Sequence, residues 1–333
     1  THSVVGGVMG AGIASVGFAL VNWSTMAKIA ASWVISPLLG GVIAAIFLGF
    51  IKSNIIYRED KIAAARRWVP ILISLMAAVF SCYLVMKGLK KIWKADIVSI
   101  LGIGVAVFII AHLLLKPWIY KQSQGMENRN QSLRQLFHVP LICSAALLSF
   151  AHGANDVANA VGPLAAIFHS VQSGDISSKV EIPIWVMLIG AFGISLGLFL
   201  FGPKLIHMVG QQITKMNPMR AFCVALSAAI TVIFASALGL PVSSTHIAVG
   251  AVFGVGFFRE FYTSRSKRRR DYVRSKQGEV FEFSRGGPKN GELRKRKLVR
   301  RSHFYTIVAA WLITVPATAL ISGAIYLGLN LVR

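Results

Sequence analysis

The chain has 333 residues, with 35 Lys and Arg against 12 Asp and Glu, which gives a formal net charge of +23. Hydrophobic residues make up 55% of the chain and charged residues only 14%, about half the share of an ordinary soluble domain. This composition excludes an ordinary soluble globular domain and predicts an all-α protein that crosses the membrane several times.

Seven apolar stretches are each close to the roughly 20 residues that a helix needs to cross the hydrocarbon core. In chain order, we expect spanning helices at 3–21, 33–51, 68–89, 97–115, 183–202, 219–239 and 304–328. Two further apolar stretches, 137–168 and 241–258, contain glycine and proline and are expected to be broken. Freed backbone groups are tolerated at membrane depth only against protein or a water-filled cavity, so both stretches predict half-helices that meet at a midplane site.

An internal repeat relates the start of the chain to a segment near its end. Residues 1–12 return as residues 245–256 with seven identical positions, and residues 33–37 resemble 311–314, with Pro316 one place late. Two similar segments in the same order predict a duplication, and we expect the two copies to be inverted in the membrane.

The spacing of the repeat also predicts what the chain lacks. Gly153 precedes the second copy, and its first-copy counterpart would precede Thr1. We therefore expect the N-terminal part of the first repeat to be missing here, and a site built from both copies to be incomplete.

The segment from Gly153 to Ala160 reads GANDVANA and lies in a run that is otherwise free of formal charge. An acid near the membrane centre costs about 2.5 to 3.5 kcal/mol, so such residues usually line an ion or substrate path. Asn155, Asp156 and Asn159 offer the oxygen ligands that suit small hard cations. We expect a Na+ or H+ site at Asp156, with a re-solvated loop between two short helices as the alternative.

Three consecutive hydroxyl residues follow Pro241, at the predicted start of a helix: Ser243, Ser244 and Thr245. A helix start offers free N–H donors and a positive dipole end, which together bind a tetrahedral oxyanion. One hydroxyl is enough to cap a helix, so three in a duplicated motif favour an anion site. An intramembrane hydrolase with Ser243 or Ser244 as nucleophile and His246 as base is a distant alternative, because these residues lie close together along one segment.

The histidines near these motifs have two interpretations. His2 and His246 occupy equivalent repeat positions, and His152 precedes Gly153. Each is either a proton relay, since imidazole titrates near neutrality, or a hydrogen-bonded structural residue. No role is assigned to the remaining histidines or to the three single cysteines.

A basic segment separates the last two apolar stretches. Between Arg259 and Arg301 there are sixteen Lys or Arg and five Asp or Glu, about half of the net charge. The positive-inside rule places this segment in the cytoplasm. A nucleic-acid arm is disfavoured because the cluster at 268–270 lacks interleaved aromatic residues, and contact with anionic lipid headgroups is the expected secondary role. The lysines between 87 and 94 would then lie outside, which fits the rule poorly.

The two motifs together, GANDVANAVGPL at 153–164 and PVSSTH at 241–246, resemble those of the inorganic phosphate transporter (PiT) family, and the resemblance covers nearly the whole chain. It implies a secondary transporter of two inverted repeats, not an enzyme, that moves inorganic phosphate with Na+ or H+ and forms homodimers. It implies no cofactor beyond the coupling ion. A transporter of sulfate or another oxyanion is the near alternative.

The resemblance also implies roles for residues of the two motifs. Asn155 and Asp156 would belong to the cation and phosphate site, with Asn159 beside them, and the hydroxyls from Ser243 to Thr245 would hold phosphate oxygens. Thr1 would be the first-copy equivalent of Thr245. The general form of the chain indicates a multi-pass protein of the bacterial inner membrane.

We expect four parts along the chain. Residues 1–136 would hold the remainder of the first repeat and connecting helices, and 137–258 the second-repeat core with both motifs. Residues 259–303 would form the basic cytoplasmic loop, and 304–333 the last transmembrane helix.

Overall fold

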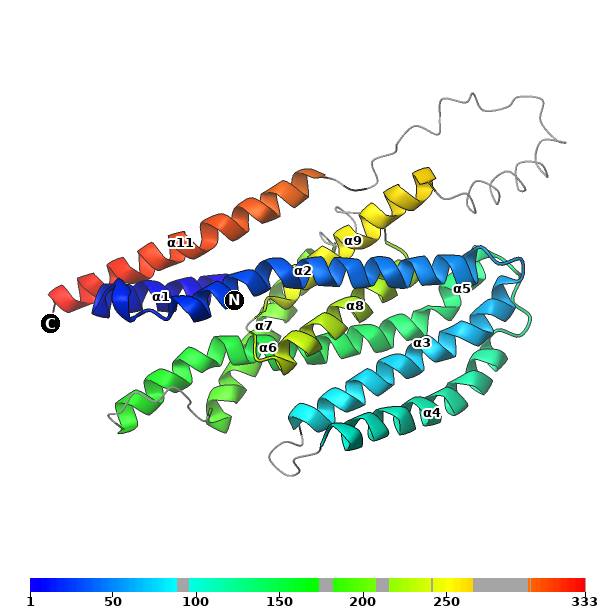
Figure 1. Cartoon of the computed structure of the whole chain (residues 1–333), viewed down its shortest axis with the longest axis horizontal. Helices are drawn as coiled ribbons and strands as arrows, with labels where there is room; N and C mark the ends of the chain where they lie inside the picture. The colour runs from blue at the N-terminus through cyan, green and yellow to red at the C-terminus, as the bar shows by residue number, and fades with distance from the viewer. Residues whose placement is uncertain are drawn as a thin grey trace, which may run out of the picture.

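The computed structural model describes residues 1–88, 96–173, 182–207, 216–240, 242–265, 299 and 301–332. All regular elements in these ranges are helices, as the composition predicts (Figure 1). In chain order they are α1 (His2–Val16), η1 (Phe18–Leu20), α2 (Trp23–Ile51) with η2 (Lys52–Ile56), α3 (Lys61–Tyr83) with η3 (Leu84–Gly88), α4 (Ile97–Gln122), α5 (Asn130–Leu136), α6 (His138–Ser173), α7 (Ile184–His207), α8 (Pro218–Ala237), α9 (Ser244–Arg265) and α11 (Arg301–Leu331).

Seven of the described helical segments are long and apolar enough to cross a membrane. They are Trp23–Ile56, Lys61–Met86, Ile97–Gln122, His138–Gln172, Ile184–Lys204, Pro218–Ala237 and Val308–Leu331. Six of them match predicted spans, but the expected span at 3–21 is wrong. Its helix α1 ends at Val16, where Gly17 adopts a φ of 82°, a conformation that glycine reaches without strain.

Short polar side chains set several helix starts. Asn22, Asp60 and Asn217 each accept a hydrogen bond from the backbone N–H three residues further on, at 2.9 to 3.0 Å. These bonds satisfy donors that the first helical turn leaves free. In α8, Pro218 follows the cap at a position where a missing N–H costs nothing.

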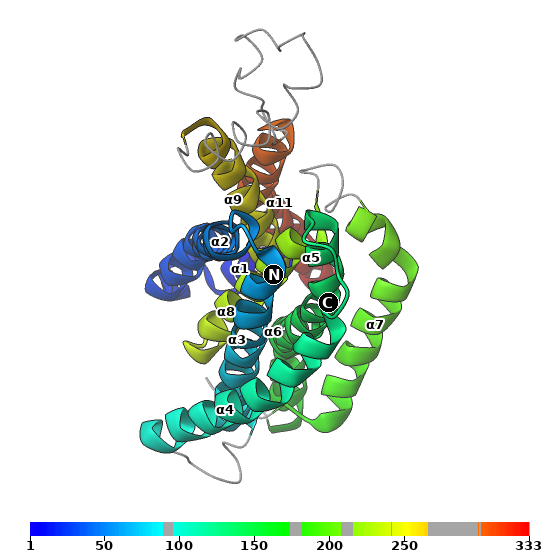
Figure 2. The same ribbon diagram turned by 90° about the vertical axis from the view of Figure 1, so that its right-hand side faces the viewer.

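The core lies around α8, which packs against α2, α6 and α9. In its span 72% of residues are buried, whereas in α4 and α7 the share is 6%. Figure 2 shows α7 and α4 at the periphery of the helical body. Their exposed apolar side chains, such as Leu113 and Phe199, are what a lipid-facing surface requires.

The two sequence repeats pack reciprocally. Helix α1 of the first copy packs against α11 of the second, and α9 of the second packs against α2 of the first (Figure 1). The glycines at the two contacts correspond as well. A Cβ on Gly250 would overlap the Pro37 carbonyl oxygen, and a Cβ on Gly6 would meet the Val315 carbonyl oxygen.

This correspondence holds one turn further along. A Cβ on Gly254 would overlap the Gly41 carbonyl oxygen, and one on Gly10 would overlap that of Ala319. Equivalent residues thus make equivalent contacts in both pairs, which a two-fold relation between the copies produces. The repeat found in the sequence is therefore also a structural repeat.

The expected break within 137–168 is wrong, since α6 runs without interruption from His138 to Ser173. One glycine in a helix costs only about 1 kcal/mol, and a proline removes one backbone hydrogen bond without ending the helix when its surroundings support it. The second expected interruption is present. The chain turns at Gly239, with a φ of 71°, and α9 begins anew at Ser244.

Most of the expected basic loop at 259–303, the lysine-containing loop around 87–94 and Pro241 lie outside the described residues. Where the basic segment is described, α9 extends through it as far as Arg265, and α11 begins at Arg301.

Candidate functional site

The starts of α1 and α9 meet beside the middle of α6. Thr1 Oγ1 donates to the carbonyl oxygen of Val242 at 3.3 Å, and the rings of His2 and His246 lie with their centroids 4.5 Å apart. His2 is buried and also stacks on Trp33, at 3.9 Å between centroids. Two equivalent histidines of the repeat therefore touch where the two copies come together.

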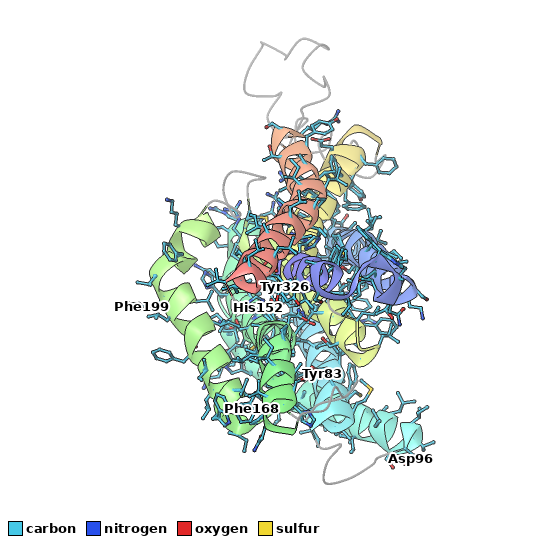
Figure 3. All side chains as sticks on the ribbon, turned by 90° about the vertical axis from the view of Figure 1, so that its left-hand side faces the viewer. Tyr83, Asp96, His152, Phe168, Phe199 and Tyr326 are labelled. Carbon is cyan, nitrogen blue, oxygen red and sulfur yellow. The ribbon has the colours of Figure 1, made fainter. Side chains whose placement is uncertain are left out.

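One face of α6 carries four polar side chains into this junction: His152, Asn155, Asp156 and Asn159. Their spacing of three, four and seven residues places them on one side of a helix. Figure 3 shows His152 where the helices converge, whereas Phe199 on α7 points outward. Because the helix is continuous, its regular geometry is what aligns the four groups.

Asn155 and Asn159 connect α6 to the turn before α9. Asn155 Nδ2 donates to the Val242 carbonyl at 2.7 Å, and Asn159 Nδ2 reaches the same oxygen at 3.4 Å and Thr1 Oγ1 at 3.3 Å. Asn155 is buried, and its own Oδ1 accepts from Ser236 Oγ at 3.4 Å. These bonds satisfy polar groups that would be costly to bury unpaired.

Asp156 lies at the centre of the cluster and accepts hydrogen bonds at both carboxylate oxygens. Oδ1 accepts from Asn155 at 3.1 Å and from Asn159 at 3.4 Å. Oδ2 accepts from Ser244 Oγ at 2.6 Å and faces His152 Nδ1 at 2.8 Å. Asp156 is also the one acidic residue within the seven candidate spans. The cluster thus stabilises a negative charge at membrane depth.

The three consecutive hydroxyls take different positions. Ser243 Oγ accepts from the backbone N–H of His246 at 3.4 Å, which is a capping contact. Ser244 is buried and donates to Asp156. Thr245 is exposed on the first turn of α9. The structure therefore brings Ser244, but not all three hydroxyls, into direct contact with the carboxylate.

Three groups in the cluster were missed or left undecided by the sequence. His152 had equal support as a relay and as a structural residue, although its spacing of four from Asp156 was a usable signal. Ser236 lies in an apolar helix without a motif, and Val242 contributes only its backbone carbonyl. Neither carries a sequence signal, because both arrive through the tertiary packing of α8 and the α9 turn against α6.

The cluster contains Ser, His and Asp but not a nucleophile relay. In a hydrolase triad the two imidazole nitrogens contact the serine and the aspartate separately. Here His152 uses the same nitrogen, Nδ1, toward both Ser244 and Asp156, and Ser244 also contacts Asp156 directly. His246, the expected base, contacts Ser243 through its backbone N–H.

Fold and site together define a polytopic membrane transport protein. Its helices are apolar and its repeats pack reciprocally. The carboxylate of Asp156 lies within a candidate span, beside the starts of α1 from the first copy and α9 from the second.

The family follows from comparison with known proteins. Residues 1–322 match the phosphate transporter family (PHO4), and the chain belongs to that family. The resemblance to inorganic phosphate transporters is thus confirmed, and the protein is a transporter of this family, not an enzyme. The expected hydrolase alternative is wrong.

Individual relatives agree with this assignment. The chain is 43% identical to a protein described as "Putative phosphate permease" from Helicobacter pylori, over 100% of this chain and 71% of that one. It is 36% identical to "Inorganic phosphate transporter 2-1, chloroplastic" of Arabidopsis thaliana, over 83% of this chain and 51% of that one. A solved structure described as "The sodium-dependent phosphate transporter" matches with a TM-score of 0.82 and 33% identity, over 100% of this chain and 73% of that chain.

Proposed function

We propose that this protein imports inorganic phosphate coupled to Na+ by alternating access around the Asp156 cluster. The observation that carries the proposal is the direct contact between Asp156 on α6 and Ser244 at the start of α9, 2.6 Å between Oδ2 and Oγ. A carboxylate suits a hard cation, and a helix start suits an oxyanion. The likeness to a solved sodium-dependent phosphate transporter supports Na+ over H+ as the coupling ion.

In this proposal Asn155 and Asp156 bind the cation. The phosphate oxygens are held by Asn155, Asn159 and the first turn of α9 with Ser243, Ser244 and Thr245, and Thr1 is the first-copy counterpart. Thr1 donates to the same Val242 carbonyl that Asn155 and Asn159 contact, which supports a shared site.

Coupling follows from the single proton of the Ser244 hydroxyl. That proton is directed to Asp156 Oδ2, so it is not available to a phosphate oxygen at the same time. A Na+ ion at Asp156 neutralises the carboxylate and weakens it as an acceptor. The hydroxyl is then free to donate to phosphate, which makes cation binding favour anion binding at an adjacent position.

Rocking of one repeat against the other then exposes the site to the opposite side. The close glycine contacts of the α1–α11 and α2–α9 pairs support motion of each pair as a unit, since backbones in van der Waals contact leave little freedom within a pair. We propose the bacterial inner membrane as the location, with residues 259–303 in the cytoplasm, and a homodimer as the assembly.

The test is uptake of radiolabelled phosphate into proteoliposomes that hold the full-length protein. An inward Na+ gradient is compared with an inward pH gradient, with sulfate as competitor. Uptake driven by the Na+ gradient and unaffected by sulfate is expected. Strong sulfate competition would favour a broader oxyanion transporter, and uptake driven only by the pH gradient would identify H+ as the coupling ion.

A further inference from the structure

His152 lies at the point where the proposed cation and phosphate positions adjoin. Its Nδ1 is 2.8 Å from Asp156 Oδ2 and also makes a short contact with Ser244 Oγ. The residue sits one helical turn before Asp156 on α6 and is partly buried, with 30% of its side chain exposed. One ring nitrogen therefore touches both groups whose contact underlies the proposed coupling.

The hydrogen-bond roles follow from the chemistry of the three groups. A carboxylate accepts only, so Nδ1 must carry the hydrogen that it directs toward Asp156 and Ser244. The Ser244 proton is directed to Asp156, which leaves the serine oxygen with lone pairs that accept from Nδ1. With Nδ1 carrying the hydrogen, His152 is a donor to the oxygen of Ser244.

We propose that His152 is a positioning residue for phosphate: its Nδ1–H holds the Ser244 oxygen so that the hydroxyl proton, once released from Asp156, is directed to a phosphate oxygen. This inference rests on the proposed function. Other titratable side chains face the same junction, namely His246 at the start of α9 and His2 at the start of α1. The rings of these two histidines contact each other, whereas His152 Nδ1 contacts the Ser244 hydroxyl.

The proposal predicts opposite effects on the two substrates. Loss of Nδ1–H leaves the Ser244 hydroxyl without a fixed orientation, which weakens phosphate binding. The same N–H also donates to Asp156 Oδ2 and competes there with Na+, so its loss does not weaken Na+ binding. A histidine that only packs the two helices together would, when removed, weaken both.

Substitutions of His152 can separate the roles of its two ring nitrogens. The side-chain amide of Asn can take the place of Nδ1, whereas that of Gln corresponds to Nε2. We expect His152→Asn to stay within about threefold of wild type in half-saturating phosphate. His152→Gln and His152→Ala should raise the half-saturating phosphate concentration about tenfold, because each removes a hydrogen bond of about average strength or somewhat more. Half-saturating Na+, measured in the absence of phosphate, should stay unchanged or fall in all three.

The matched control is His138→Ala, which removes an exposed histidine at the start of the same helix. Each purified protein is assayed for equilibrium phosphate binding as well as for uptake, and its thermal unfolding is recorded. An unchanged phosphate affinity in His152→Ala, or a parallel loss of phosphate and Na+ affinity, would overturn the positioning role.

Binding and uptake together separate this inference from the proposed function. If wild type binds phosphate but shows no Na+-driven uptake, the proposed coupling fails, and the ranking of the His152 variants in the binding assay still decides the positioning role. If wild type binds no phosphate, both proposals are overturned.

Discussion

Asn155 Nδ2 lies 2.7 Å from the carbonyl oxygen of Val242, so a side chain in the middle of α6 holds the turn from which α9 begins. This bond is formed between residues that are far apart in sequence, and it fixes the position of Ser244 two residues further on. The anion-binding helix start and the intramembrane carboxylate are therefore oriented by the same segment of α6.

Asn155→Ala should loosen this junction. It removes the shortest bond to Val242 and also the acceptor for the half-buried Ser236, so the Val242 carbonyl keeps only the longer bonds from Thr1 and Asn159. We expect a loss of about 1 to 3 kcal/mol of stability, together with weaker phosphate binding. Thermal unfolding of the detergent-purified protein measures the first and equilibrium phosphate binding the second. Wild-type values for both would show that the junction does not depend on this bond.

Asp156→Asn should abolish Na+-driven phosphate uptake while the protein remains folded, because the amide cannot supply the negative charge that attracts the cation. We expect at least a hundredfold loss of the initial rate in proteoliposomes. Asp96→Asn is the control. Asp96 lies at the surface just before α4, and the hydrogen bond from Ser99 lowers its pKa, so its carboxylate is charged at neutral pH. The substitution removes this surface charge and should leave uptake intact. Concentrative uptake by the Asp156 variant would refute the cation role.

Ser243→Ala and Ser244→Ala should have different effects, although the residues are neighbours. Ser243 caps α9 and its Oγ already accepts from the His246 N–H, so its loss should cost about 1 kcal/mol of stability and raise half-saturating phosphate less than the loss of Ser244 does. Ser244 contacts Asp156, so its loss should raise half-saturating phosphate about tenfold or more with a smaller effect on Na+. Phosphate titrations of uptake and unfolding curves for both variants provide the comparison. Identical profiles would mean that the two hydroxyls share one role.

Gly254→Ala should disrupt the contact between α2 and α9, since the added Cβ would overlap the Gly41 carbonyl oxygen. Overpacking of this kind typically costs about 1 to 3 kcal/mol. Gly12→Ala is a suitable control, because nothing lies within 4 Å of the Cβ position there. Monodispersity in detergent and the unfolding temperature should fall only in the Gly254 variant. Equal stability of the two variants would contradict the close backbone contact.

The sequence predicted those parts of the fold and site that depend on local spacing. The apolar lengths predicted six of the seven candidate spans, and the repeat predicted a duplication, which the structure shows in the packing of α1 with α11 and of α9 with α2. Asn155 and Asn159 share a face of α6, as their spacing of four residues indicates. Hydropathy could not tell the short helix α1 from a full span, because its apolar residues continue past the glycine at which the helix ends.

What the sequence could not predict depends on contacts between distant segments. The three hydroxyls make different contacts because of how α9 begins against α6, and among them Ser244 contacts the carboxylate of Asp156. The roles of Ser236 and the Val242 carbonyl follow from the packing of α8 and the α9 turn on α6. The break expected after Gly153 was wrong because glycine and proline only weaken a helix, and tertiary contacts on both sides support α6 here.

The central claim is that Na+ at Asp156 releases the Ser244 hydroxyl to phosphate, and equilibrium binding of radiolabelled phosphate at increasing Na+ concentrations tests it most directly. In the wild-type protein, Na+ should raise phosphate affinity about tenfold or more, and phosphate should raise Na+ affinity by the same factor. In Asp156→Asn, phosphate binding should no longer depend on Na+. Phosphate binding by that variant that still rises with Na+ as in wild type would contradict the claim.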